Sequence, residues 1–191
     1  MSVSLRTVRL LLRPWRDEDI AAVGEMSADP AVMEYLVPLA ERGLSVETWV
    51  AGKRAHWDEH GFGQWVVERP SEASFIGVVG LGVVSYEAPF TPAVEVAWRL
   101  AHLYWGQGYA TEAARAAIGY GFDELGLREI VALTVPANQR SRRVMERLGM
   151  TRLPEDDFDH PGVPEGPLKR CVLYRLRKPE GRAADLSGRR G

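Results

Sequence analysis

Two glycines near the middle of the chain separate a strand-like run from a helix-like run. The run at 94–100 is apolar and β-branched, and a helical pattern begins at about Thr111. Glycine lets the backbone approach a ligand closely, and the first turn of a helix leaves several N–H groups unpaired at the positive end of its dipole. Phosphate is the group that such a turn binds best. The turn itself reads Trp105-Gly106-Gln107-Gly108-Tyr109-Ala110.

Two other interpretations compete with the one in which this turn binds the phosphate of a ligand. Glycines between a strand and a helix can serve only to make a tight turn, and this alternative stays open on the sequence alone. A dinucleotide-binding fingerprint needs a third Gly or Ala three residues after the second glycine, and an acidic residue after the next strand. Thr111 takes the third-glycine position, and the next strand ends in Val135-Pro136-Ala137-Asn138. We therefore exclude a dinucleotide fold.

The turn and its flanks resemble the acyl-CoA signature of the GNAT superfamily, in which a strand leads to Arg/Gln-x-x-Gly-x-Gly/Ala and a helix. Gly108 and Ala110 match the last two fixed positions, while Trp105 stands where Arg or Gln is usual. The variant is similar to the RimJ/RimL-like branch of ribosomal-protein N-terminal acetyltransferases. Two more segments resemble that branch in order and spacing, so the resemblance covers roughly residues 5–176: Thr7-Val8-Arg9-Leu10-Leu11-Leu12-Arg13 and Asn138-Gln139-Arg140-Ser141-Arg142-Arg143-Val144-Met145-Glu146-Arg147-Leu148-Gly149-Met150.

The resemblance implies that acetyl-CoA, or another acyl-CoA, is the co-substrate and that no metal is needed. The strand that begins at Val94 would diverge from the strand that ends at Val135. The pantetheine arm would enter this gap and pair with backbone groups near Trp98, Arg99 and Leu100, as an added strand does. One backbone amide there would polarise the thioester carbonyl.

The resemblance also assigns the phosphates of the cofactor. The pyrophosphate would lie on the amides of 105–110. Asn138 would bind the pantetheine arm while it also caps a helix. Arg143, with Arg140 and Arg142, would add positive charge near the phosphates, although basic residues on a helix also form ordinary solvated faces.

Transfer in this family is a direct attack of an amine on the thioester, without an acyl-enzyme. The amine must lose a proton, and the departing thiolate should gain one. Glu95 is the candidate base; a glutamate with an ordinary pKa of about 4.3 is weak, so we expect it to act through water or with a raised pKa. Strand alternation is equally compatible with a surface-facing Glu95. Many relatives use a tyrosine as acid where this chain has Met145; Ser141 is the replacement we favour, and Tyr104 is a further candidate.

The expected reaction transfers acetyl from acetyl-CoA to an amine, on a small molecule or at a protein N-terminus. The acceptor side should be formed by 29–36, the second helix and the loop at 153–168. An α-amine, with a pKa of about 8 against about 10.4 for lysine, is easier to present neutral, which slightly favours α-amine acceptors without excluding polyamines. Two alternatives stay open: a non-catalytic acyl-CoA-binding regulatory domain, suggested by Met145, and transfer of another acyl group such as succinyl.

The elements around the turn predict an α/β (α+β) fold. The runs at 64–68 and 75–84 are joined by a short turn, so they should be antiparallel, whereas the strand–helix–strand unit at 94–135 should be parallel and right-handed. A single mixed, mostly antiparallel central sheet with helices on both faces follows. The GNAT resemblance adds that the parallel pair is splayed.

Capping residues and composition predict where the helices and the domain end. Asp17, Ser45 and Asn138 are placed to cap helices. We expect one GNAT acyltransferase domain over 1–177 and a disordered, charged and glycine-rich tail over 178–191.

The bulk composition excludes several classes of protein. The chain has 191 residues, 46% of them hydrophobic, and a formal net charge of −2, which suits one domain without a bias toward nucleic acid. The single cysteine, Cys171, excludes an intrachain disulfide, and the four histidines show no metal-ligand spacing. No stretch approaches the ~20 apolar residues that span a bilayer, and residues 1–6 lack an apolar signal core, so we expect a cytoplasmic protein without a membrane partner. A homodimer is expected by analogy with relatives.

Overall fold

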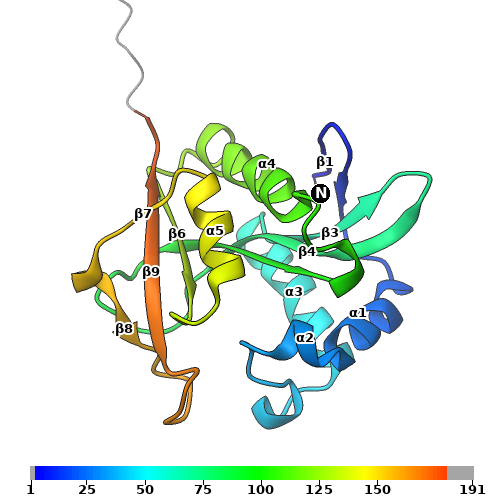
Figure 1. Ribbon diagram of the computed structural model, residues 1–191. Helices are drawn as coiled ribbons and strands as arrows, with labels where there is room; N and C mark the ends of the chain where they lie inside the picture. The colour runs from blue at the N-terminus through cyan, green and yellow to red at the C-terminus, as the bar shows by residue number, and fades with distance from the viewer. Residues whose placement is uncertain (1–2, 180–191) are drawn as a thin grey trace, which may run out of the picture.

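The computed structural model describes residues 3–179, which fold around one central sheet (Figure 1). Its helices are α1 (Asp19–Ala28), α2 (Pro30–Met33), α3 (Val46–His60), α4 (Tyr109–Asp123) and α5 (Gln139–Arg147), with short 3-10 turns η1 (Ala40–Arg42), η2 (His102–Tyr104) and η3 (Pro154–Asp156). Its strands are β1 (Leu5–Arg6), β2 (Leu11–Arg13), β3 (Gln64–Arg69), β4 (Ala73–Val83), β5 (Val94–Leu100), β6 (Glu129–Thr134), β7 (Thr151–Arg152), β8 (Phe158–Asp159) and β9 (Arg170–Arg177).

The sheet is mixed and mostly antiparallel, as the sequence predicts. Its strands follow the order β1-β2-β3-β4-β5-β6-β9-β7, and β8 pairs with β9. Every pair is antiparallel except β5 and β6, which are parallel and meet at a single pair of residues, Glu95 and Val131. The predicted parallel unit and its splay are therefore both confirmed.

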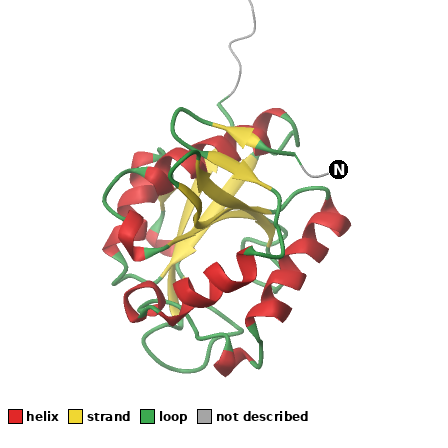
Figure 2. Ribbon diagram, turned by 90° about the vertical axis from the view of Figure 1, so that its right-hand side faces the viewer, coloured by secondary structure: helices red, strands yellow, loops and turns green. Residues whose placement is uncertain are grey.

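Helices cover both faces of the sheet (Figures 1 and 2). On one face α4 packs its small side chains, Ala113, Ala114 and Ala117, against β4 and β5. On the other face α1 and α3 enclose a second apolar cluster that includes Trp49 and Val78. The alanines let α4 lie close to the sheet, which brings the first turn of α4 to the end of β5.

The helix caps agree with two of the three predictions. The Ser45 hydroxyl accepts from Thr48 N at 3.2 Å, and the Asn138 amide oxygen accepts from Ser141 N at 3.1 Å. The prediction for Asp17 is wrong, because α1 begins two residues later and Glu18 precedes it without a side-chain cap. Asp17 is instead exposed and pairs with Arg54 at 2.8 Å.

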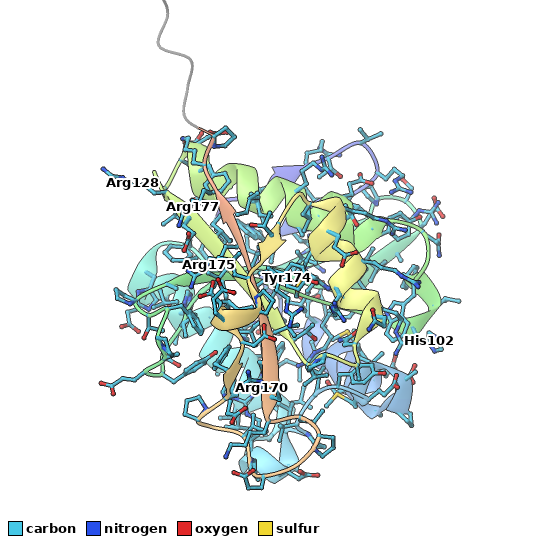
Figure 3. All side chains as sticks on the ribbon, turned by 60° about the vertical axis from the view of Figure 1, so that its left-hand side comes forward. His102, Arg128, Arg170, Tyr174, Arg175 and Arg177 are labelled. Carbon is cyan, nitrogen blue, oxygen red and sulfur yellow. The ribbon has the colours of Figure 1, made fainter. Side chains whose placement is uncertain are left out.

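The end of the described chain stays attached to the domain. Arg175 and Arg177 on β9 both pair with Glu129 on β6, at 2.7 and 3.1 Å (Figure 3). Lys178 continues this edge, because its amide donates to Arg128 O at 2.8 Å. The rest of the predicted disordered tail, from residue 180 on, lies outside the described residues, and the domain bounds stay a prediction. Within 3–179 no helix combines the length and apolar content needed to cross a bilayer.

A buried arginine joins the end of β2 to the rest of the domain. The Arg13 side chain is 3% exposed and that of Asp19 is 2% exposed. Their pairing is bidentate, at 2.9 and 2.8 Å, and Arg13 Nε also donates to Glu68 at 2.8 Å. Its remaining hydrogen bonds reach Pro14 O and Ser74 O. The bond to Asp19 is the main cause that raises the pKa of Arg13 above its ordinary value.

Replacing Asp19 with alanine should lower the free energy of unfolding by about 3–5 kcal/mol, because it leaves a charged guanidinium buried without its main partner. Urea unfolding at neutral pH measures the loss. The matched control is Asp17→Ala, which removes an ion pair from a side chain that is 90% exposed. That change should cost less than about 1 kcal/mol. Equal losses in the two variants would contradict a structural role for the Arg13–Asp19 pair.

Candidate active site

The site is organised by the gap that opens between β5 and β6. After the single pairing of Glu95 with Val131 the two strands share no further residue pair, so the β6-facing edge of Trp98, Arg99 and Leu100 has no partner strand. On its other side β5 stays fully paired with β4 from Val94 to Leu100. The edge of β5 that faces β4 is thus held along its whole length, while the edge that faces β6 is open to an added chain beyond Glu95.

A glycine in β4 allows this close pairing at the end of β5. Gly77 lies opposite Leu100, and a β-carbon added at Gly77 would come within 2.3 Å of Arg99 O. Only a residue without a side chain fits there. Pairing with β4 therefore fixes the backbone of 98–100, the segment predicted to bind the pantetheine arm.

The turn after β5 presents unpaired backbone donors. Gly106 and Gly108 have φ values of 75° and 81°, which glycine adopts without strain, and α4 begins directly after Gly108. Within residues 3–179 the amides from Gly106 to Thr111 donate to no protein acceptor. The Trp105 amide differs, because it closes the η2 turn by donating to His102 O at 3.0 Å. The free donors therefore run from 106 to 111, one residue later than the range 105–110 predicted from the sequence.

Side chains hold this turn in shape and are not themselves free for a ligand. Trp105 Nε1 donates to Leu100 O at 2.8 Å, which ties the turn back to the end of β5. The Gln107 side chain donates to Leu103 O at 3.2 Å. The Tyr109 ring is buried, with the Arg9 guanidinium 4.5 Å from its centroid. Gln107 and Tyr109 can thus contribute only their backbone amides, and Trp105, whose amide and indole N–H both donate inside the protein, supports the turn without offering a free donor.

Arg9 and Glu112 fasten the turn to the start of the chain. Glu112 in the first turn of α4 accepts from Thr7 Oγ1, Arg9 N and Arg9 Nε, at 2.6, 2.9 and 2.6 Å. Arg9 Nη1 also donates to Gln107 O at 3.0 Å. These contacts join residues about a hundred positions apart, so no local pattern in the sequence indicates them.

A shallow open hollow of about 720 Å³ adjoins the free amides. Its lining includes Arg9, Gly108, Thr111 and the exposed Arg115, whose Nη2 donates to Arg147 O at 3.1 Å. Glu112 neutralises Arg9, which leaves Arg115 and Arg147 as the positive charges that line the hollow. Arg115 was not among the residues predicted from the sequence.

Asn138 and Ser141 form one hydrogen-bonded unit at the start of α5. Asn138 Nδ2 donates to Thr134 Oγ1 at 3.0 Å and to Ser141 Oγ at 3.1 Å. Both amide protons of Asn138 are therefore used inside the protein, while its oxygen accepts from Ser141 N. Because Ser141 Oγ already accepts a hydrogen bond, its own proton is free to be donated elsewhere.

The three arginines predicted near the phosphates have different surroundings. Arg140 pairs with Glu34 and lies 4.7 Å from the centroid of the Trp105 ring. Arg142 donates to Tyr174 OH and Pro136 O, both at 3.2 Å. Arg143 is exposed and forms no ion pair within 3–179. Met145, at the usual tyrosine position, is buried in the core. It cannot act as an acid.

Glu95 lies at the closed end of the gap and is half-buried. Its side chain projects from the face of β5 that also carries Arg99, opposite the face that packs on α4. Burial raises the pKa of Glu95 above its ordinary value, and the nearby Lys53 ammonium partly opposes this effect. Of the two alternatives that the sequence left open, a half-buried carboxylate with a raised pKa agrees with this geometry better than a solvent-facing strand residue.

Several polar groups around Glu95 were not found from the sequence. Lys53 of α3 and Arg99 both lie over the Trp49 ring, at 5.1 and 5.2 Å from its centroid. Tyr86 comes from the loop after β4, and its buried hydroxyl has no hydrogen-bond partner within 3–179. Burial is the main cause that raises the pKa of Tyr86, and Glu95 adds to it. Across the same described residues, no group of three acidic, histidine or cysteine side chains could hold a metal ion.

The sequence and the fold match known proteins consistently. Residues 9–151 match the family described as the acetyltransferase (GNAT) domain. The chain is 33% identical to the FsC-acetyl coenzyme A-N(2)-transacetylase of Aspergillus fumigatus, over 92% of this chain and 80% of that protein. An acetyltransferase structure from Agrobacterium tumefaciens, 28% identical, aligns with a TM-score of 0.73 over 93% of this chain and 96% of that chain.

The RimL ribosomal L7/L12 alpha-N-protein acetyltransferase, in a structure with coenzyme A, shares the fold. Its TM-score is 0.71 at 16% identity, with coverage of 92% of this chain and 98% of that chain. This likeness shows that the two chains share the fold. Together with the matched family domain and the splayed strand pair, these findings show that the chain belongs to the GNAT acetyltransferase family and is an N-acetyltransferase that uses an acyl-CoA co-substrate.

Proposed function

We propose that the chain transfers an acetyl group from acetyl-CoA to a primary amine by direct attack within a ternary complex. The observation that carries this proposal is the row of unpaired amides from Gly106 to Thr111, which lies next to the open edge of β5. The names of relatives that are acetyltransferases support acetyl as the acyl group. We place the reaction in the cytoplasm, where acetyl-CoA is supplied; a homodimer stays a prediction.

The cofactor would lie along two adjoining surfaces. The pantetheine arm would pair with the backbone of Trp98, Arg99 and Leu100, and the pyrophosphate would accept from the free amides at the start of α4. Arg115 and the exposed Arg143 would supply charge near the phosphates. The internal use of both Asn138 amide protons supports a positioning role for Asn138, which orients Ser141.

The chemistry needs one base and one acid. The amine nitrogen attacks the thioester carbon, the C–N bond forms, and the C–S bond breaks in the collapse of the tetrahedral intermediate. Glu95 takes the proton that the amine loses, directly or through water, and later releases it to solvent. Ser141 Oγ gives its proton to the departing thiolate and takes up another from water, which restores the hydroxyl. A raised pKa makes Glu95 a stronger base than an exposed glutamate.

A non-catalytic acyl-CoA-binding domain is less well supported. Met145 removes the usual tyrosine, but the free proton of Ser141 and the half-buried Glu95 supply replacements for both proton transfers. A transferase for a dicarboxylic acyl group such as succinyl remains the second candidate, because Arg99 and Lys53 place positive charge on the acceptor side.

Gly108→Ala should weaken coenzyme A binding about tenfold. An alanine at this positive φ costs roughly 1–2 kcal/mol of strain, and the backbone relieves the strain by turning the free amides away from the pyrophosphate. Isothermal titration calorimetry with coenzyme A measures the change. Gly126→Ala is the matched control, because Gly126 also has a positive φ, of 67°, but follows the other end of α4. Equal affinities in the two variants would contradict the phosphate assignment, and no binding by the wild type would overturn the cofactor site.

Glu95→Gln should lower kcat/KM by about 100-fold or more while coenzyme A affinity stays unchanged. A base works only when ionised, so activity is present above the Glu95 pKa and is lost as the pH falls through it. Because burial raises that pKa, this loss should begin at a higher pH than for an exposed glutamate, and it should vanish in Glu95→Gln. Profiles of kcat/KM against pH measure this loss, and Glu129→Gln on β6 is the control. If Glu95→Gln gives the same profile as the wild type, Glu95 is not the general base.

Ser141→Ala should lower kcat by about tenfold or more, because the thiolate leaves without a proton donor, while coenzyme A affinity is preserved. Single-turnover thiol release measures the chemical step. Tyr104→Phe tests the other candidate acid in the same assay. A wild-type rate in Ser141→Ala together with a slow Tyr104→Phe would transfer the role to Tyr104.

A further inference from the structure

Two cations that form no salt bridge within 3–179 gather on the expected acceptor side. Lys53 Nζ and the Arg99 guanidinium carbon lie 5.1 and 5.2 Å from the centroid of the same Trp49 ring. Both side chains are half-buried, one from α3 and one from β5. We call Trp49, Lys53, Glu95 and Arg99 the acceptor-side cluster. Glu95 belongs to it through its charge interaction with Lys53, not through a salt bridge.

The cluster leaves its cations unsatisfied. Within 3–179 neither Lys53 nor Arg99 takes part in a salt bridge, and Arg99 Nη1 is buried without a hydrogen-bond partner. Burial, followed by repulsion from Arg42, lowers the pKa of Arg99 to about 10. Burial also lowers the pKa of Lys53, and Arg99 and Arg42 lower it further against the attraction of Glu95.

The partners of Arg13, a buried arginine with a structural role in the same domain, provide a comparison for Arg99. Arg13 has Asp19 and Glu68 as ionic partners, and two carbonyls accept its other hydrogen bonds. Arg99 has none of these. A buried polar group without a partner costs folding free energy, so an unpartnered guanidinium nitrogen next to the open edge of β5 indicates that a ligand supplies the partner.

We propose that the amine acceptor carries an anionic group, a carboxylate, which Arg99 and Lys53 bind while Glu95 receives the amine proton. This inference rests on the proposed function and names its substrate class. A carboxylate would give Arg99 Nη1 the charge-assisted hydrogen bond that it lacks. A polyamine would add positive charge to an already cationic surface and is excluded by it.

Strand geometry limits the size of the acceptor. Glu95, Ala97 and Arg99 project from one face of β5, and successive residues on one face are roughly 7 Å apart. An amine that attacks beside Ala97, between the base and the arginine, therefore has its carboxylate within about 7 Å of the nitrogen. A free amino acid has these dimensions.

The test compares each L-amino acid with its own carboxamide, in the presence of acetyl-CoA, by thiol release. The carboxamide is neutral at that end, and its amine is less basic, so more of it is in the reactive neutral form. The comparison is therefore biased against the proposal. We expect at least one free acid to exceed its carboxamide by roughly 10- to 100-fold in kcat/KM, which is the range for a hydrogen bond to a charged group.

Arg99→Gln should abolish most of this preference, so that the ratio of kcat/KM for the acid to kcat/KM for its carboxamide falls toward one. Lys53→Gln, on α3, should also reduce the preference for the acid. It serves as the second variant if Arg99→Gln does not fold. Arg54→Gln is the matched control, because Arg54 is the next residue on α3 and pairs with Asp17 at 2.8 Å. It should keep the wild-type preference.

Three results would overturn the proposal and are distinguishable. Carboxamides or spermidine used as well as the acids would leave the acetyltransferase reaction intact but remove the anionic acceptor. With carboxamide acceptors, the enzyme could use succinyl-CoA better than acetyl-CoA and lose this difference in Arg99→Gln. That result would mean that Arg99 binds the carboxylate of the acyl group and not one on the acceptor. No thiol release with any amine, despite coenzyme A binding, would overturn the proposed function itself.

Discussion

The pairing of β5 constrains everything that surrounds the site. On one edge β5 is bonded to β4 over its whole length, and on the other it meets β6 only at Glu95 and Val131. A sheet normally satisfies backbone groups on both edges of an inner strand, so the open edge beyond Glu95 is a built-in place for an extended ligand. The gap also separates the two proton-transfer candidates, with Glu95 on β5 and Ser141 after β6.

The first turn of α4 completes what the open edge begins. Small residues on α4 let the helix pack closely on β4 and β5, so its free amides lie directly after the unpaired segment. Trp105, Arg9 and Glu112 then fix the turn from three directions. Because the donors are held in place before a ligand arrives, little reorganisation is needed when phosphate binds.

Charge is distributed in two contrasting ways within the domain. Around Arg13 every buried charge has a counter-charge, as stability requires. Around Trp49, Lys53 and Arg99 form no salt bridge with any residue of 3–179, and the nearby Glu95 is half-buried. Groups whose pKa values are shifted from their ordinary positions often mark functional sites, and Glu95 and Arg99 lie together on the face of β5 opposite α4.

The sequence by itself determined the family, the sheet with its parallel unit, two of three helix caps and the turn whose amides are unpaired. These features depend on local patterns, since glycines at positive φ and unpaired amides at a helix start follow from neighbouring residues. The tertiary structure decided that the Trp105 amide is used internally, that α1 starts after Asp17, and that Glu95 is half-buried. It also brought Lys53 and Arg99 over one ring, and Arg9 to Glu112. Such contacts join distant segments whose approach is set by packing across the sheet, so no spacing along the chain encodes them.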